Sequence, residues 1–184
     1  MMADMFRVPV YKVSVTPWDE IKTKILSHLE GSEYREVDNV TTDYKGPEPK
    51  YREYDAPVYE ILTPYISEIS NQLGLELPSE PPNMWSQKYT NGSEHTIHNH
   101  GNRGYSFILY LKFNPLVHKA TRFYAPFDHF FTGETLTWVP PDIQEGDLIA
   151  FPSAIKHTSQ YQTSDEERMI LSFNLFHPVG WYNP

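Results

Sequence analysis

The sequence contains no cysteine among its 184 residues. This absence excludes disulfide bridges, zinc sites built on thiolates and catalysis by a thiol. Basic residues are also scarce, because 15 lysines and arginines stand against 24 acids and the net charge is −9. A chain of this charge repels nucleic acid and anionic lipid, so we expect neither as its main partner.

Long apolar runs are missing as well. The chain has no stretch of the roughly 18 apolar residues that a membrane helix needs, and Met1–Arg7 lacks the apolar core of a signal peptide. We therefore expect a cytoplasmic protein with no membrane partner. No internal repeat or low-complexity segment is visible either, and 184 residues suffice for one domain with a buried core.

Aromatic residues and prolines are abundant instead, at 15% of the chain and 16 residues respectively. This balance favours short strands and ordered loops over a helical bundle. Within the expected domain 1–184, residues 1–82 are predicted to form a helical support region. Val8–Val15 predicts a first strand, and Thr16, as the N-cap, begins a helix that ends at Gly31.

A second helix is predicted from about Ala56 to Leu73, bent or weakened at Pro64 and ended by Gly74. Residues 32–55, between the two helices, are predicted to be an extended loop with at most one short strand.

Residues 83–184 have a different pattern, in which short apolar runs alternate with glycine, proline and aspartate. This pattern predicts an antiparallel jelly roll, a mainly β core flanked by the two helices. Leu116–Gly133 is long for a loop between strands and is a candidate lid. The predicted strands are Met84–Thr90, Gly104–Phe113, Ala120–Tyr124, Glu134–Val139, Gly146–Phe151 and Arg168–Phe176.

Three of the eight histidines lie within residues 95–100, just before the most apolar run of the chain. If this stretch is extended, His98 and His100 point to the same face of a strand, about 6–7 Å apart, and can share one metal ion. A third ligand must come from elsewhere, and His157 is the best candidate. Imidazole suits iron, zinc, copper and nickel.

The other histidines fit this site less well. His98 lies three positions after His95, an odd step along a strand, so we expect His95 to lie off the shared face. The remaining four have no spaced partner and are expected to be structural or solvated: His28, His118, His129 and His177.

Arg168 opens a strand whose same-face positions are Ile170, Ser172 and Asn174. Beside two glutamates, it could be an ordinary surface ion pair of little energetic value. If it points into the barrel, its buried guanidinium needs an anion and is suited to a bidentate grip on a carboxylate. Tyr110 is either a core aromatic or a second group that shares this carboxylate.

Together and in this order, these motifs resemble the iron(II)- and 2-oxoglutarate-dependent oxygenases, above all the small prolyl-hydroxylase-like branch of bacteria and their phages. The resemblance covers about residues 84–177. It rests on these motifs: His98-x-His100-x-Asn102, Ser106–Leu111, Gly146–Ser153 with His157, Arg168, and Ser172–Asn174.

The resemblance implies a double-stranded β-helix core and a dioxygenase that hydroxylates a C–H bond, with Fe(II) and 2-oxoglutarate as cofactors. His98 and His157 would bind the metal, and Arg168 would hold the far carboxylate of 2-oxoglutarate, helped by Tyr110 and Ser172. A prolyl residue of a protein is the substrate by analogy only. The compartment would be the host cytoplasm if a phage encodes the chain.

The chain departs from the usual ligand set of two histidines and one carboxylate, because His100 stands where the carboxylate is expected. We expect His100 to be a true ligand, which gives His98, His100, His157 and Arg168 as the catalytic set. The alternative is a carboxylate from elsewhere, with these candidates: Asp147, Asp128 and Glu94.

Two other classes of function remain open on the sequence. The chain could be a cupin-like enzyme that uses three histidines without 2-oxoglutarate, in which case Arg168 would be dispensable for turnover. It could also be a jelly-roll binding module without enzymatic activity, in which the histidines are structural or hold zinc.

Overall fold

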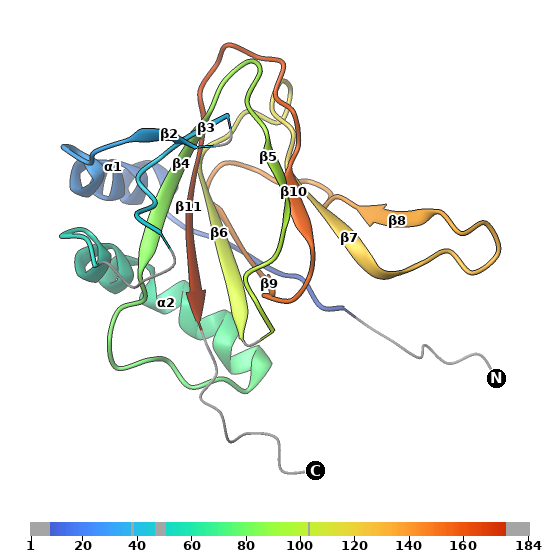
Figure 1. Cartoon of the computed structure of the whole chain (residues 1–184). Helices are drawn as coiled ribbons and strands as arrows, with labels where there is room; N and C mark the ends of the chain where they lie inside the picture. The colour runs from blue at the N-terminus through green and yellow to red at the C-terminus, as the bar shows by residue number, and fades with distance from the viewer. Residues whose placement is uncertain (1–7, 38, 47–50, 103, 176–184) are drawn as a thin grey trace.

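The computed structural model describes residues 8–37, 39–46, 51–102 and 104–175 (Figure 1). Strands dominate, and both helices lie in the first half of the chain. The elements are β1 (Tyr11–Ser14), α1 (Trp18–Leu29), β2 (Arg35–Val37), β3 (Val40–Thr42), α2 (Asp55–Leu73), β4 (Met84–Tyr89), β5 (His95–His98), β6 (Tyr105–Lys112), β7 (Thr121–Asp128), β8 (Thr135–Trp138), β9 (Asp147–Pro152), β10 (His157–Ser159) and β11 (Arg168–Leu175).

The strands form two antiparallel sheets. The larger sheet has seven strands in the order β1-β9-β6-β11-β4-β3-β2, and the smaller has four in the order β5-β10-β7-β8. Strands far apart in the sequence are therefore neighbours, as β6 lies between β9 and β11. The predicted mainly β fold with flanking helices is confirmed.

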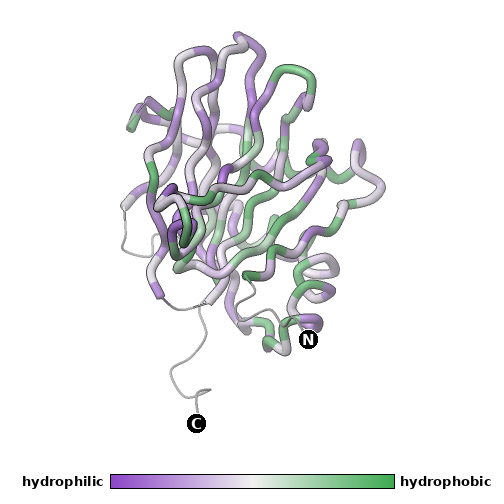
Figure 2. The backbone as a smooth tube through the Cα atoms, turned by 90° about the vertical axis from the view of Figure 1, so that its right-hand side faces the viewer, coloured by the Kyte–Doolittle hydropathy of each residue, from purple (hydrophilic) through white to green (hydrophobic). Residues whose placement is uncertain are grey.

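Both faces of the seven-stranded sheet are covered, which explains the unbroken apolar run of β6. Phe107 and Leu109 point to the helices and share a buried cluster with Leu62 of α2. Ile108 and Tyr110 alternate with them and belong to a second cluster, which lies between the two sheets. Figure 2 shows hydrophobic stretches along the central strands, whereas the loops at its upper end are mainly hydrophilic.

The helices lie where the sequence predicts, but α1 begins differently. Pro17 is its N-cap, in extended conformation with ψ 123°, so the prediction of Thr16 as the cap is wrong. The second helix contains Pro64 and ends at Gly74, whose φ of 65° closes it in the left-handed conformation. Among the described residues, neither helix is long and apolar enough to cross a membrane.

The first 82 residues contribute strands as well as helices. The predicted loop 32–55 contains two short strands, because β2 and β3 form a hairpin that extends the sheet beside β4. The first strand, β1, pairs with β9 at the opposite edge.

The candidate lid Leu116–Gly133 is not a loop throughout. Its central part is β7, which runs to Asp128 and forms a hairpin with β8. The prediction failed because Pro126 and the polar residues after it interrupt the apolar pattern, although the pairing with β8 still continues there.

Helix α1 is fixed to the turn before β9 by Trp18. Its indole Nε1 donates a hydrogen bond of 2.9 Å to Glu145, and Lys22 approaches the same carboxylate at 2.6 Å. The neighbouring Gly146 has a φ of 87°, and a Cβ there would lie 2.8 Å from Cδ2 of Trp18. Only glycine fits this position without moving the helix.

The variant Gly146→Ala is therefore expected to lower the free energy of unfolding by about 2–5 kcal/mol, through backbone strain and overpacking together. Gly133→Ala is the matched control, because φ is 69° there but nothing lies within 4 Å of the added Cβ. It should lose only about 1–2 kcal/mol. Urea denaturation measures both, and equal losses would show that contact with Trp18 is unimportant.

Candidate metal centre

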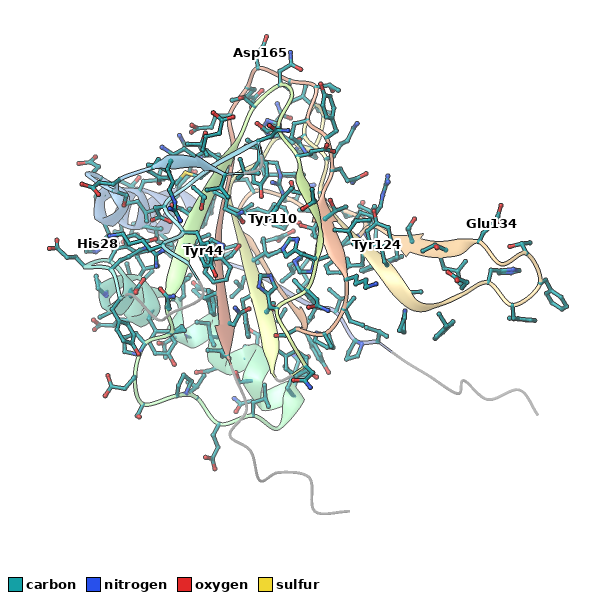
Figure 3. All side chains as sticks on the ribbon, in the orientation of Figure 1. His28, Tyr44, Tyr110, Tyr124, Glu134 and Asp165 are labelled. Atoms are coloured by element: carbon teal, nitrogen blue, oxygen red, sulfur yellow. The ribbon has the colours of Figure 1, made fainter. Side chains whose placement is uncertain are left out.

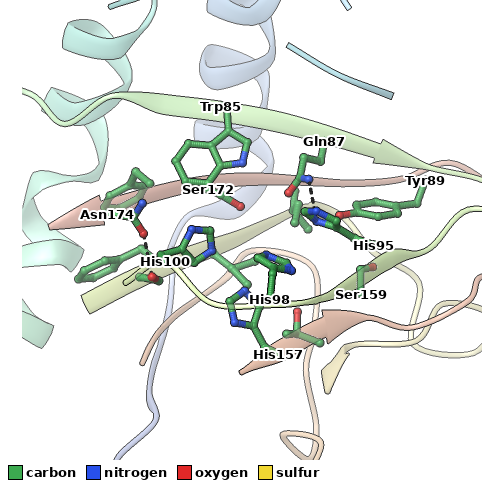
Figure 4. Close-up of a pocket in the computed structure, with 16 residues that line it drawn as sticks. Trp85, Gln87, Tyr89, His95, His98, His100, His157, Ser159, Ser172 and Asn174 are labelled. Atoms are coloured by element: carbon green, nitrogen blue, oxygen red, sulfur yellow. Dashed lines mark hydrogen bonds between the residues drawn. The ribbon is translucent and has the colours of Figure 1, made fainter. Parts of the chain in front are cut away.

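Three histidine side chains meet at one end of the space between the sheets (Figure 4). Antiparallel pairing of β5 with β10 places His98 opposite His157. His100 lies beyond the end of β5, and its backbone N–H donates to the carbonyl of Ser153 at 2.9 Å. The nitrogen atoms that the three rings offer to a metal all lie within 4.8 Å of one another. The predicted convergence therefore exists, although a loop rather than a strand brings His100 into it.

Backbone carbonyls orient two of these rings. The Nδ1 atom of His98 lies 2.7 Å from the carbonyl of Thr96, and that of His157 lies 3.0 Å from the carbonyl of Ile155. Because a carbonyl only accepts, Nδ1 carries the proton in both hydrogen bonds. In the neutral rings Nε2 is therefore the atom with a free lone pair, which is the arrangement that a metal ligand needs.

The site keeps its imidazoles neutral. Burial lowers the pKa of His157 to about 3, with a further contribution from the neighbouring imidazoles. Burial lowers the pKa of His100 to about 4, again assisted by its histidine neighbours, and also lowers that of His98. At neutral pH all three imidazoles are uncharged, so no proton has to leave before a metal ion binds.

His95 also lines this pocket, so the prediction that it lies off the shared face is wrong. The register between β5 and β10 shifts by one residue, because His157 is opposite His98 and Ser159 is opposite His95. This bulge absorbs the odd step along β5. The ring of His95 lies 4.1 Å from that of His98, and Nε2 of Gln87 lies 3.3 Å from its Nδ1.

The histidines line a small cavity of about 30 Å³. Trp85, Gln87 and Tyr89 reach it from β4, while Ser172 and Asn174 reach it from β11. Strand alternation thus directs the predicted same-face positions of β11 into this space, as the sequence pattern indicated.

Arg168 lies behind this pocket and is fully buried, with 0% of its surface exposed. Its guanidinium carbon lies 4.6 Å from the ring centre of Tyr89 and 5.5 Å from that of Tyr110. One terminal nitrogen donates to Ser159 Oγ at 3.1 Å. Within the described residues, Nε and Nη2 have no hydrogen-bond partner. A buried cation with two free donors indicates a site for an anion.

Tyr110 contacts Arg168 through its ring rather than its hydroxyl. That hydroxyl donates to Thr121 Oγ1 at 3.1 Å and accepts from the backbone N–H of Thr121 at 3.2 Å. Sequence reasoning missed Tyr89 and Ser159, which stand nearer to the free donors. Tyr89 is opposite Arg168 in the β4–β11 register, and no pattern within either strand reveals that pairing.

The three alternative carboxylates lie in other surroundings. Asp147 occupies the turn into β9, where Ser14 Oγ donates to it at 2.7 Å and the N–H of Gln144 at 2.9 Å. Asp128 accepts from Thr135 in the β7–β8 hairpin, and Glu94 borders an outer groove of the smaller sheet. In the part of the chain that the structure describes, the histidine trio is the one cluster suited to a metal ion.

The four histidines for which the sequence predicts no partner differ in their surroundings. His28 is exposed on α1, and His129 lies in the β7–β8 hairpin. His118 is buried, and its two ring nitrogens bond the backbone N–H of Asn114 and the carbonyl of Glu166. His177 lies outside the described residues.

Two packed antiparallel sheets, three converging imidazoles and a lone buried guanidinium define the class of metal-dependent oxygenases that take a keto-acid cosubstrate. The chain belongs to the 2OG-Fe(II) oxygenase family, whose model matches residues 83–174. It is therefore an Fe(II)- and 2-oxoglutarate-dependent dioxygenase. A search of curated proteins by sequence found no match.

Solved structures share the fold, the double-stranded β-helix of this family. A prolyl-4-hydroxylase from Pseudomonas putida aligns with a TM-score of 0.59 at 16% identity, over 91% of this chain and 92% of that one. The viral collagen prolyl hydroxylase of Paramecium bursaria Chlorella virus-1 aligns with a TM-score of 0.57 at 15% identity, over 90% and 94%. HygX from Streptomyces hygroscopicus, solved with nickel and 2-oxoglutarate, aligns with a TM-score of 0.63 at 10% identity, over 94% and 84%.

Because Arg168 is buried without a carboxylate, replacing it should stabilise the protein when no cosubstrate is present. Arg168→Met is expected to raise the free energy of unfolding by about 1–3 kcal/mol, measured by urea denaturation. Arg122→Met, on a half-buried arginine of β7, is the control and should change it by no more than about 0.5 kcal/mol. A loss of stability in Arg168→Met would mean that the guanidinium is satisfied within the fold.

Proposed function

We propose that His98, His100 and His157 bind the iron of this dioxygenase, that Arg168 holds the far carboxylate of 2-oxoglutarate, and that the substrate is a residue of a protein. The observation that carries the proposal is the fully buried guanidinium whose Nε and Nη2 have no hydrogen-bond partner among the residues that the structure describes. These two donors match the fork that binds a carboxylate in bidentate fashion.

The three histidines also fit an iron ion. Three neutral imidazoles at this separation suit an intermediate metal, and hydrogen bonds from Nδ1 to backbone carbonyls fix two of the rings. When bound, iron and 2-oxoglutarate supply the oxidative chemistry, which consumes dioxygen, releases succinate and carbon dioxide and hydroxylates a C–H bond.

The remaining residues hold the cosubstrate-binding group in place and keep the site dry. Tyr89 and Tyr110 flank the guanidinium, and Ser159 fixes one of its nitrogens. Ser172, 5% exposed and in the pocket wall, is placed to offer its hydroxyl to the same anion. The ring of Trp85, beside His100, limits the access of water to the histidines.

Because residue 100 is a histidine and not a carboxylate, the proposed metal site has only neutral ligands. A trio of neutral ligands leaves bound Fe(II) one unit more positive than two histidines and a carboxylate would. This extra charge favours a dianionic cosubstrate, and Arg168 adds to it from behind the pocket. The cupin-like alternative without 2-oxoglutarate gives the unpaired guanidinium no task, and the family makes the chain an enzyme rather than a binding module.

A protein substrate is proposed by analogy with the prolyl hydroxylases, although HygX, solved with the small molecule hygromycin B, shares the same fold. The Pseudomonas putida and Chlorella virus enzymes align over at least 90% of this chain. A prolyl residue is therefore the first side chain to test, with peptides and metabolites screened in parallel for hydroxylation by mass spectrometry.

Removing a ligand should abolish turnover. We expect His98→Ala and His157→Ala to lose iron-dependent succinate formation completely, whereas His100→Asp retains or raises it, because a carboxylate restores the common ligand set. His28→Ala, on an exposed residue of α1, serves as the control and should match the unchanged protein. If isothermal titration shows that none of the three site variants alters Fe(II) binding, the ligand assignment is wrong.

Replacing the guanidinium of Arg168 should weaken the binding of 2-oxoglutarate selectively. Arg168→Lys keeps the charge but loses bidentate geometry, so the Kd for 2-oxoglutarate should rise about 30- to 150-fold, which corresponds to about 2–3 kcal/mol. Anaerobic titration measures this through the weak visible band that requires both Fe(II) and 2-oxoglutarate. Arg122→Lys is the matched control, and equal affinities in both variants would remove Arg168 from the cosubstrate site.

A further inference from the structure

The β7–β8 hairpin extends beyond the rest of the molecule (Figure 1). Strand β8 lies at the end of the four-stranded sheet, and in the described part of the chain its one strand neighbour is β7. All four residues of β8 are exposed. Its outer edge therefore presents backbone donors and acceptors that another strand can pair with.

Apolar side chains accompany this free edge. At the tip of the hairpin, Phe130 and Phe131 are 85% and 82% exposed, and along β8 Leu136 and Trp138 are 39% and 48% exposed. Soluble proteins rarely leave such a set of neighbouring apolar side chains in water unless something binds to it.

One face of the hairpin leads directly to the histidines. Trp138 pairs with Phe123 in the β7–β8 register, and their ring centres are 5.9 Å apart. The ring of Phe123 lies in turn 6.1 Å from that of His157. Strand alternation puts Leu136 on the same face as Trp138. A ligand on this face at Trp138 is therefore separated from His157 by one buried ring, that of Phe123.

From residue 123 onward, the charged side chains of the hairpin are acidic. Residues 123–155 contain no lysine or arginine, while Asp128 and Glu134 lie in the hairpin itself. In Figure 3 the carboxylate of Glu134 stands at the far end of the hairpin, away from the body of the molecule. The surface is thus apolar and acidic, and it complements a partner that is apolar and basic.

We propose that the β7–β8 hairpin is the docking site for an extended, apolar and basic segment of the protein substrate, which adds as a strand to the free edge of β8. This inference rests on the proposed function, because it concerns how a polypeptide reaches the iron site. Main-chain hydrogen bonds supply the affinity, and the apolar face of Leu136 and Trp138 supplies the side-chain selectivity.

A second copy of this chain fits the edge less well. Pairing two hairpins would bring the carboxylates of both copies, with no basic residue between positions 123 and 155 of either, onto one shared surface. Like charges at an interface oppose association, whereas a basic segment gains from the same acids.

The test selects peptides from a display library of random sequences, long enough to form a strand, against the Fe(II)- and 2-oxoglutarate-loaded protein. We expect the enriched peptides to alternate apolar residues and to carry net positive charge. N-methylation of one alternating set of backbone amides should abolish binding, whereas methylation of the other set should be tolerated, since only every second amide faces the partner strand. Enrichment of no peptide, or tolerance of both methylation patterns, overturns strand addition.

Two variants of β8 locate the site. Leu136→Gln should weaken binding of the selected peptides at least about tenfold. Thr137→Gln, which makes a comparable change on the opposite face of the same strand, should leave it unchanged. Equal binding by both variants overturns the proposal. A dimer in analytical ultracentrifugation that Leu136→Gln dissociates and Thr137→Gln does not would assign the edge to a second copy instead.

The failure of this inference is distinct from that of the proposed function. Both β8 variants should keep the visible band that needs Fe(II) and 2-oxoglutarate, and both should still form succinate slowly without substrate. If the unchanged protein lacks the band, the iron and cosubstrate assignments fail. If the band is present and the peptides ignore β8, the docking surface alone is wrong.

Discussion

The register between β5 and β10 is the constraint on which this site depends. Antiparallel pairing puts His157 opposite His98, and a shift of one residue lets His95 enter the same pocket. Because side chains alternate along a strand, a slip of either strand would turn an imidazole to the opposite face. The sheet therefore supplies the separation that a metal ion requires before any ion binds.

The larger sheet has a complementary task, since it presents a charge in a place where charge is costly. Helices α1 and α2 cover one face of this sheet, so its other face is free to line the pocket. There Arg168 lies between two tyrosine rings, and one of its terminal nitrogens donates to Ser159. A buried cation of this kind costs stability, which an anion bound to it, as proposed for 2-oxoglutarate, would offset.

The two sheets also divide the work of recognition. Ser172 of β11 lines the pocket, and Arg168 of the same strand lies behind it against Tyr89 and Ser159, which also line it. Phe123 and Trp138 lead from His157 into the hairpin. In the proposed functions, the anion site lies within the fold and binds a small ligand, whereas the apolar face at the edge strand binds a larger one.

The sequence by itself determined the chemistry, because local patterns carry it. The spacing of His98 and His100 and the apolar run of β6 predicted two converging imidazoles and a buried strand, whereas the alternation after Arg168 left its inward orientation open. Tertiary structure alone decided which distant residues meet. Tyr89 and Ser159 beside Arg168, His95 in the pocket and β2 and β3 in the sheet all depend on strand register. Register is fixed by the packing of whole sheets, and no short stretch of sequence encodes it.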